Sequence, residues 1–146
     1  MKVESFSMDH TKVKAPFVRK CGVLTGPKGD VVSKFDLRMM QPNMAAIPPG
    51  ALHAMEHLLA SYLRDEVENV IDLSPMGCRT GFYFIVWGEP SIEQIQTALC
   101  NALQRIVNAT EVPAANEIQC GNYRDLSLFG AQEYAKLVLK GFLQNI

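Results

Sequence analysis

The sequence ALHAMEHLLASYLRDE, residues 51–66, decides much of the fold. Its apolar side chains recur at helical spacing and spread widely around the helix axis, which predicts a long, central and largely buried helix. Pro48-Pro49-Gly50 leads into it, and the charged run at residues 64–68 is typical of a solvated terminus. The helix also carries two histidines and a glutamate, groups that are costly to bury without partners.

His53 and His57 are four residues apart, so their imidazoles lie on one helix face and can bind the same metal ion. Glu56 precedes His57 and is close enough to act on a bound water or substrate. This H-x-x-E-H order is the inverse of the more familiar zinc-protease motif. The alternative is a pair of core histidines that bond to the backbone. The cost of burying all three polar groups favours a metal site.

Two cysteines are candidates for chemistry at such a site. A catalytic ion usually takes three protein ligands and keeps one position open, and Cys120, followed by Gly121, could be the third ligand as a thiolate. Cys78 ends the tight loop at residues 74–78, where the freedom of Gly77 can aim the sulfur at a pocket. Its alternative role is a small buried hydrophobe. Spacing alone does not decide either assignment.

The rest of the chain mixes strands and helices without a regular βαβ rhythm, which predicts an α+β fold. A turn-rich hexapeptide at 25–30 separates two strands and indicates an antiparallel hairpin. In the second strand apolar residues alternate with Lys34, Asp36 and Arg38, so Arg38 should face away from the core, toward solvent, a cleft or a partner. Ser91 and Gln94 form a capping-box pattern. We predict strands at 18–24, 31–40, 70–73 and 81–87, a strand or extended segment at 112–119, and helices at 51–66, 91–107 and 131–143.

Length and composition limit the kinds of function that this chain can have. The chain has 146 residues, and we expect one domain over residues 1–146. A net charge of -1 with interspersed signs argues against a nucleic-acid partner. We find no signal-like apolar run and no stretch near the ~20 apolar residues that a membrane span needs. We therefore expect a cytoplasmic protein with reduced thiols, in which burial, catalysis or metal binding explain the cysteines better than disulfides. The four are Cys21, Cys78, Cys100 and Cys120, of which the first and third look structural.

Five motifs together resemble one known family. They are Ser5-Phe-x-x-Asp9-His10, Phe35-Asp36-x-Arg38, the H-x-x-E-H helix, Ser74-Pro-Met-Gly-Cys78 and Pro113-Ala-Ala-Asn-Glu117-x-Gln-Cys120-Gly121. Their order is that of the S-ribosylhomocysteine lyases, enzymes that recycle homocysteine and make the precursor of the quorum-sensing signal autoinducer-2. The resemblance covers nearly the whole chain. It implies an antiparallel sheet packed against helices as a two-layer sandwich, related to H-x-x-E-H metallopeptidases.

The resemblance also implies roles for particular residues. It implies a homodimer with active sites at the interface and one divalent metal per subunit, natively iron(II), with zinc or cobalt(II) possible. The implied metal ligands are His53, His57 and Cys120, the acid/base residues are Glu56 and Cys78, and the substrate-binding residues are Ser5, His10, Arg38, Arg64 and Asp72.

Two other functions fit parts of the pattern. In a metallopeptidase, Glu56 would activate a zinc-bound water, although related peptidases are larger and usually take an acidic third ligand. In a structural zinc domain, Cys78 would close the site as fourth ligand. The motifs in register favour the lyase over both.

Overall fold

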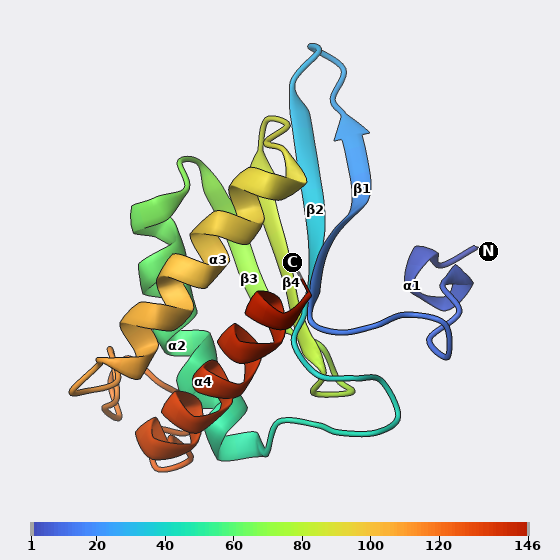
Figure 1. The fold of residues 1–146 in the computed structure, drawn as a ribbon. Helices are drawn as coiled ribbons and strands as arrows, with labels where there is room; N and C mark the ends of the chain where they lie inside the picture. The colour runs from blue at the N-terminus through green and yellow to red at the C-terminus, as the bar shows by residue number, and fades with distance from the viewer. Residues whose placement is uncertain (1, 146) are drawn as a thin grey trace.

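A computed structural model describes residues 2–145, and it confirms the predicted α+β class (Figure 1). Four strands in these residues form an antiparallel sheet in the order β1-β2-β4-β3. Helices α2, α3 and α4 lie on one side of the sheet, and the short α1 lies on the other side (Figure 1). In chain order the elements are α1 (Glu4–Ser7), β1 (Phe17–Thr25), β2 (Val31–Arg38), α2 (Pro49–Glu66), β3 (Val70–Pro75), β4 (Gly81–Trp87), α3 (Ile92–Val107) and α4 (Leu128–Gln144).

One face of the sheet is mostly apolar, because successive side chains of a strand point to opposite sides. Phe35 and Leu37 of β2 are completely buried and belong to the main core cluster. Asp36 and Arg38 point to the opposite face. Arg38 thus lies on the predicted face but is not open to solvent there, since Arg38 is only 2% exposed and Asp36 is 0% exposed. Their mutual hydrogen bonds satisfy the buried charges, as described below. The expectation that Arg38 faces a partner stays a prediction.

The predicted central helix is α2, which begins at Pro49, where the fixed φ of proline suits a first turn. It packs against β3, α3 and α4. The predicted capping box starts α3: the Ser91 hydroxyl accepts from the Gln94 amide at 3.1 Å, and the Gln94 side chain accepts from the Ser91 amide at 2.8 Å. Seven residues of α2 are buried, namely Ala51, Leu52, Ala54, Met55, Leu58, Leu59 and Leu63.

Residues 112–119 do not form the expected strand; they are a series of turns. Ala114 has a φ of 57°, outside the extended region. The Asn116 side chain accepts hydrogen bonds from the backbone amides of Ile118 and Gln119, both at 3.0 Å. A side chain that bonds its own following backbone replaces the bonds that a strand ladder would make. Local polar contacts therefore decide the conformation of this segment.

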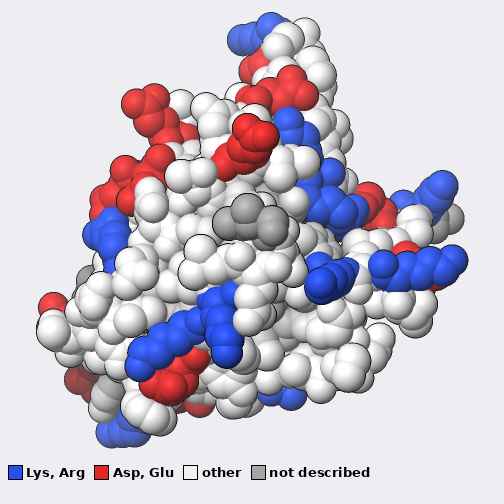
Figure 2. All heavy atoms as spheres, viewed as in Figure 1, with Lys and Arg blue, Asp and Glu red and all other residues white. Residues whose placement is uncertain are grey.

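The surface carries both signs of charge. Lys and Arg are interspersed with Asp and Glu on the face shown in Figure 2. Among the helices within residues 2–145, none is both long and apolar enough to cross a membrane.

Candidate metal centre

Three potential metal ligands converge at the surface of α2. Four residues along a helix bring the rings of His53 and His57 to a centroid separation of 4.8 Å. Cys120 approaches from the turns that follow α3, and its Sγ lies 3.5 Å from Nε2 of His53. One ligand atom from each of the three residues lies within 4.8 Å of the other two. The structure thus brings together the predicted ligand set.

Backbone carbonyls fix how the two histidines point. Nδ1 of His53 lies 2.8 Å from the carbonyl oxygen of Asp125, and Nδ1 of His57 lies 2.7 Å from that of Pro113. A carbonyl can only accept, so each Nδ1 carries the proton and donates it. Each neutral ring then has its lone pair on Nε2, which is the form that binds a metal. The side chains of His53 and His57 are 22% and 13% exposed, so neither imidazole is fully buried.

Cys120 is held by the turns around it. Its amide donates to the carbonyl of Asn116 at 3.0 Å, and its Sγ accepts from the amide of Asn122 at 3.5 Å. The thiolate is the form in which cysteine binds a metal. Because Gly121 follows, the chain is free to turn away beyond the sulfur.

The donor chemistry of this group fits a divalent ion. Two imidazoles and one thiolate suit zinc, iron(II) or cobalt(II), with metal–nitrogen and metal–sulfur bonds of about 2.0–2.3 Å. Three protein ligands leave a coordination position free, the arrangement of a catalytic rather than a structural site. Cys78 is not part of the group, although its side chain is among those described. That placement argues against a structural site with Cys78 as fourth ligand.

Glu56 lies beside the metal-ligand group. Its Oε2 is 3.8 Å from Nε2 of His57, and its side chain is 31% exposed. The carboxylate therefore faces the same side as the ligand atoms and keeps access to solvent. A carboxylate in this place can accept or return a proton at a molecule bound to the ion.

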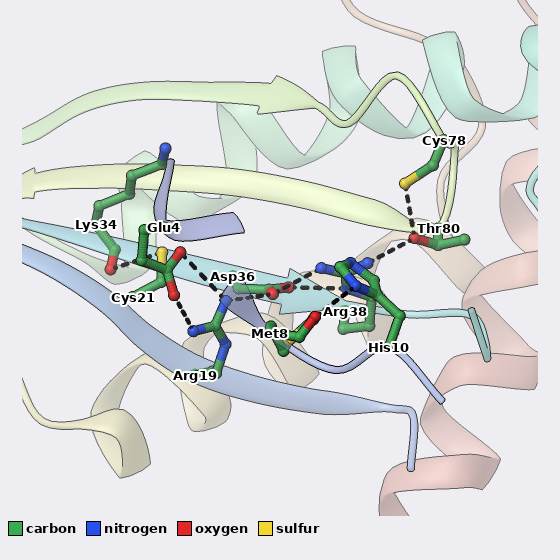
Figure 3. A network of polar contacts seen from close by, with 10 residues as sticks. All are labelled: Glu4, Met8, His10, Arg19, Cys21, Lys34, Asp36, Arg38, Cys78 and Thr80. Atoms are coloured by element: carbon green, nitrogen blue, oxygen red, sulfur yellow. Dashed lines mark hydrogen bonds and ion pairs between the residues drawn. The ribbon is translucent and has the colours of Figure 1, made fainter. Parts of the chain in front are cut away.

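Cys78 and Arg38 belong to a second group, on the far face of the sheet (Figure 3). Cys78 is exposed on the β3–β4 turn, and its Sγ lies 3.0 Å from the hydroxyl of Thr80. Arg38 donates to that hydroxyl at 3.0 Å. Asp36 accepts from Arg38 twice, at 3.0 and 2.8 Å. Within residues 2–145, no hydrogen bond or ion pair joins this group to the metal ligands.

The same buried carboxylate connects to the N-terminal helix. Arg19 of β1 donates to Asp36 at 3.2 Å and also forms an ion pair with Glu4 of α1 (Figure 3). Burial disfavours the charge of Arg19, yet its hydrogen bonds with Glu4 and Asp36 outweigh that effect and raise its pKa. Glu4 and Asp36 thus connect α1, which carries Ser5, to the sheet.

The remaining predicted site residues are more dispersed. Ser5 is partly buried on α1, and Nδ1 of His10 lies 2.9 Å from the carbonyl of Met8. Arg64 donates back to the Ala60 carbonyl of its own helix, and exposed Asp72 accepts from its neighbour Ser74. Neither Arg64 nor Asp72 contacts the metal ligands or the Cys78 group in the described part of the chain.

Sequence reasoning missed four contributors: Asp36, Thr80, Pro113 and Asp125. Asp36 lay within a quoted motif, and its position on the polar side of a strand, two residues before Arg38, was an available signal. Pro113 acts through its backbone carbonyl, which every residue has, so no residue type could reveal it. Asp125 also acts through its carbonyl, although its carboxylate lies 3.7 Å from Nδ1 of His53. Thr80 had no motif of its own beyond following Cys78 by two positions.

The fold and these contacts define a class of protein. It is an α+β protein whose central helix presents an H-x-x-E-H histidine pair, with a distant cysteine completing a candidate catalytic metal centre. Comparison with known proteins then identifies the family. The model of the family S-ribosylhomocysteinase (LuxS) matches residues 3–146. The chain belongs to this family of S-ribosylhomocysteine lyases.

Relatives of similar length agree with that membership. An S-ribosylhomocysteine lyase of Clostridioides difficile (strain 630) is 62% identical over 146 residues, covering 99% of this chain and 97% of the relative. One of Clostridium botulinum is 58% identical with the same coverage. One of Enterococcus faecalis is 55% identical over 139 residues, covering 94% of this chain and 90% of the relative.

Proposed function

We propose that this chain cleaves S-ribosylhomocysteine to homocysteine and 4,5-dihydroxy-2,3-pentanedione, the precursor of autoinducer-2. The observation that carries the proposal is the convergence of His53, His57 and Cys120 within 4.8 Å in a chain of the S-ribosylhomocysteine lyase family. Family membership also favours this reaction over peptide hydrolysis.

The substrate dictates which groups the reaction needs. The thioether of S-ribosylhomocysteine is a poor leaving group while no acidic hydrogen lies on the neighbouring carbon. Moving the sugar carbonyl from C1 to C2 and then to C3 makes the C4 hydrogen acidic, and the C5 sulfur becomes a β leaving group. Two carbonyl shifts and one β-elimination then release homocysteine. Each step moves a proton and develops negative charge on a substrate oxygen.

His53, His57 and Cys120 would hold one divalent ion. When bound, this ion supplies Lewis-acid stabilisation of the charge that develops on substrate oxygens. We propose iron(II) as the native metal, with zinc or cobalt(II) able to replace it, because all three accept imidazole and thiolate ligands. The carbonyls of Asp125 and Pro113 would orient both imidazoles toward the ion.

Glu56 and Cys78 would carry the protons. The Glu56 carboxylate, 3.8 Å from His57, can shuttle a proton between adjacent carbons of a bound sugar. The exposed Cys78 thiol can do the same from its turn, next to the hydroxyl of Thr80. Ser5, His10 and Arg38 would line the ribose pocket, and Arg64 and Asp72 would contact the amino-acid part of the substrate.

A homodimer would complete the sites. Large apolar side chains are exposed on α1, in loops and at the start of α4, and an exposed apolar group on α1 is one that a second copy could cover. Figure 1 shows α1 standing away from the helical layer. We propose that a second copy covers α1 and that each active site uses residues of both subunits. The exposed side chains are Phe6 (85%), Met44 (82%), Ile118 (91%) and Phe129 (73%).

We also propose that residues 1–146 act as one domain in the cytoplasm. The four cysteines are free, which agrees with a reducing compartment. Partial burial of Cys21 and Cys100 agrees with their expected structural roles.

The test is thiol release from S-ribosylhomocysteine by anaerobically purified protein, with metal content measured on the same sample. The matched variant is Cys78→Ala, which leaves the three metal ligands intact. We expect the wild type to release homocysteine and the variant to hold metal without activity. Fully metallated wild type that releases no homocysteine would refute the lyase, and a peptide-cleavage assay on that sample would then test the peptidase.

A further inference from the structure

The β3–β4 turn places Cys78 next to the hydroxyl of Thr80, which also accepts a hydrogen bond from Arg38. Thr80 is only 4% exposed, and its Oγ1 has two polar neighbours: Sγ of Cys78 and NH1 of Arg38, each at 3.0 Å. Its backbone is also anchored, because its carbonyl accepts from the amides of Met39 and Met40 at 2.9 Å. The hydroxyl therefore has a fixed position directly against the sulfur.

The direction of the hydrogen bonds follows from the chemistry of arginine. A guanidinium has only donors, so the Thr80 oxygen must accept from Arg38. Its own hydroxyl proton is then free to point at Cys78. Asp36 fixes Arg38 through two hydrogen bonds of 3.0 and 2.8 Å, and its carboxylate is fully buried. The chain of contacts runs from Asp36 through Arg38 and Thr80 to the sulfur (Figure 3).

We propose that Thr80 is a positioning residue for Cys78: held by Arg38 and Asp36, its hydroxyl donates a hydrogen bond to the sulfur and supports the thiolate. A thiol can instead donate its proton to the second lone pair of the Thr80 oxygen, so the same contact serves both protonation states. This property suits a group that must both take and return protons. The inference rests on the proposed function, in which Cys78 carries protons.

Other charged groups near the turn have different partners. Arg79 donates to the carbonyl of Ile47 at 3.0 Å, and the loop at residues 39–47 that contacts the turn contains no ionisable side chain. His10 of the N-terminal segment contacts the carbonyl of Met8. On α2, which packs against β3, Glu56 and the two histidines contact one another, backbone carbonyls and Cys120. Thr80 is thus the contact through which Arg38 and Asp36 reach the sulfur.

The direct test is the pH dependence of Cys78 alkylation by iodoacetamide in the metal-loaded, full-length protein, followed by mass spectrometry of the peptide that contains Cys78. Thr80→Val replaces the hydroxyl by a methyl of similar size. We expect the pH of half-maximal alkylation rate to rise by about one unit, since a hydrogen bond to a charged group is lost. Thr80→Ser keeps the hydroxyl and should restore a midpoint close to that of the wild type.

The matched control is Ser33→Ala. Ser33 of β2 is also a buried hydroxyl, and it donates to the Gly88 carbonyl at 2.7 Å. Its loss removes a buried hydroxyl without touching Cys78. Its midpoint should equal that of the wild type. If Thr80→Val does not fold, as judged by circular dichroism, Thr80→Ala compared with Thr80→Ser isolates the hydroxyl in the same way.

Equal alkylation midpoints for Thr80→Val and Ser33→Ala would overturn the inference. Lyase assays separate its failure from that of the proposed function. If Thr80 acts as proposed, kcat of Thr80→Val should follow the shifted pH profile with little change in KM. If the alkylation midpoint of Thr80→Val shifts as expected but Cys78→Ala keeps full lyase activity, the Thr80–Cys78 contact is supported. The proposed proton-carrying role of Cys78 is then refuted.

Discussion

Replacing Asp36 by asparagine should strongly destabilise the protein, because it leaves a buried guanidinium without its counter-charge. Arg38 is 2% exposed and directs two of its three observed hydrogen bonds to Asp36. Breaking a buried pair by removing one partner costs about 3–5 kcal/mol. For a chain of this length that corresponds to a fall in Tm of roughly 6–20 °C.

The assay is urea unfolding of the metal-loaded protein at pH 7, followed by circular dichroism. Glu4→Gln is the matched control. It removes the other carboxylate bound to Arg19, but this ion pair is partly exposed, at 29% for Arg19 and 48% for Glu4. We expect that variant to lose about 0–1 kcal/mol.

A double variant tests the reasoning further. Asp36→Leu combined with Arg38→Met removes both charges, so it should be several kcal/mol more stable than Asp36→Leu alone. A loss below about 1 kcal/mol in Asp36→Asn, or no recovery in the double variant, would show that the buried pair does not carry the energy assigned to it.

Other predictions concern the sheet, the thiols and the metal. A Cβ at Gly81 would collide with the backbone of β2, so Gly81→Ala should cost about 1–3 kcal/mol in urea unfolding, whereas Gly77→Ala, with nothing within 4 Å, should cost little. Burial raises the pKa of Cys21 and Cys100, so at pH 8 both should react with a disulfide reagent more slowly than exposed Cys78; equal rates for all three would contradict this. Because the pKa of both thiols is raised in the folded state, their contribution to stability is complete below about pH 8.5, the pKa of an unfolded thiol. It is lost as the pH rises through their folded-state pKa values. Urea unfolding at pH 7 and pH 10 would measure this loss. Chelation of the metal should lower Tm, because the native state loses a ligand. If the free metal concentration was 1,000 times its Kd, the free energy of unfolding should fall by about 4 kcal/mol. An unchanged Tm would argue against a metal bound to the native state.

Much of the candidate site could be predicted from local sequence. The spacing of His53 and His57 sets their common face on any helix, and Glu56 follows from the same geometry. Cys120 was different: it lies 63 positions after His57, and the segment before it was expected to be extended. Only its motif and the family resemblance pointed to it. Its placement beside His53 depends on turns that the side chain of Asn116 stabilises.

The sequence by itself determined the α+β class, the order of most elements and the paired histidines, because these depend on periodicities within one helix or strand. It also predicted which face of β2 is apolar. It did not reveal that the opposite face is buried at Asp36 and Arg38, since that depends on which strands and N-terminal residues cover it. Tertiary structure alone decided which carbonyls orient the imidazoles and which hydroxyl contacts Cys78. Those contacts join residues far apart in the chain or use backbone groups that all residues share, so no local pattern encodes them.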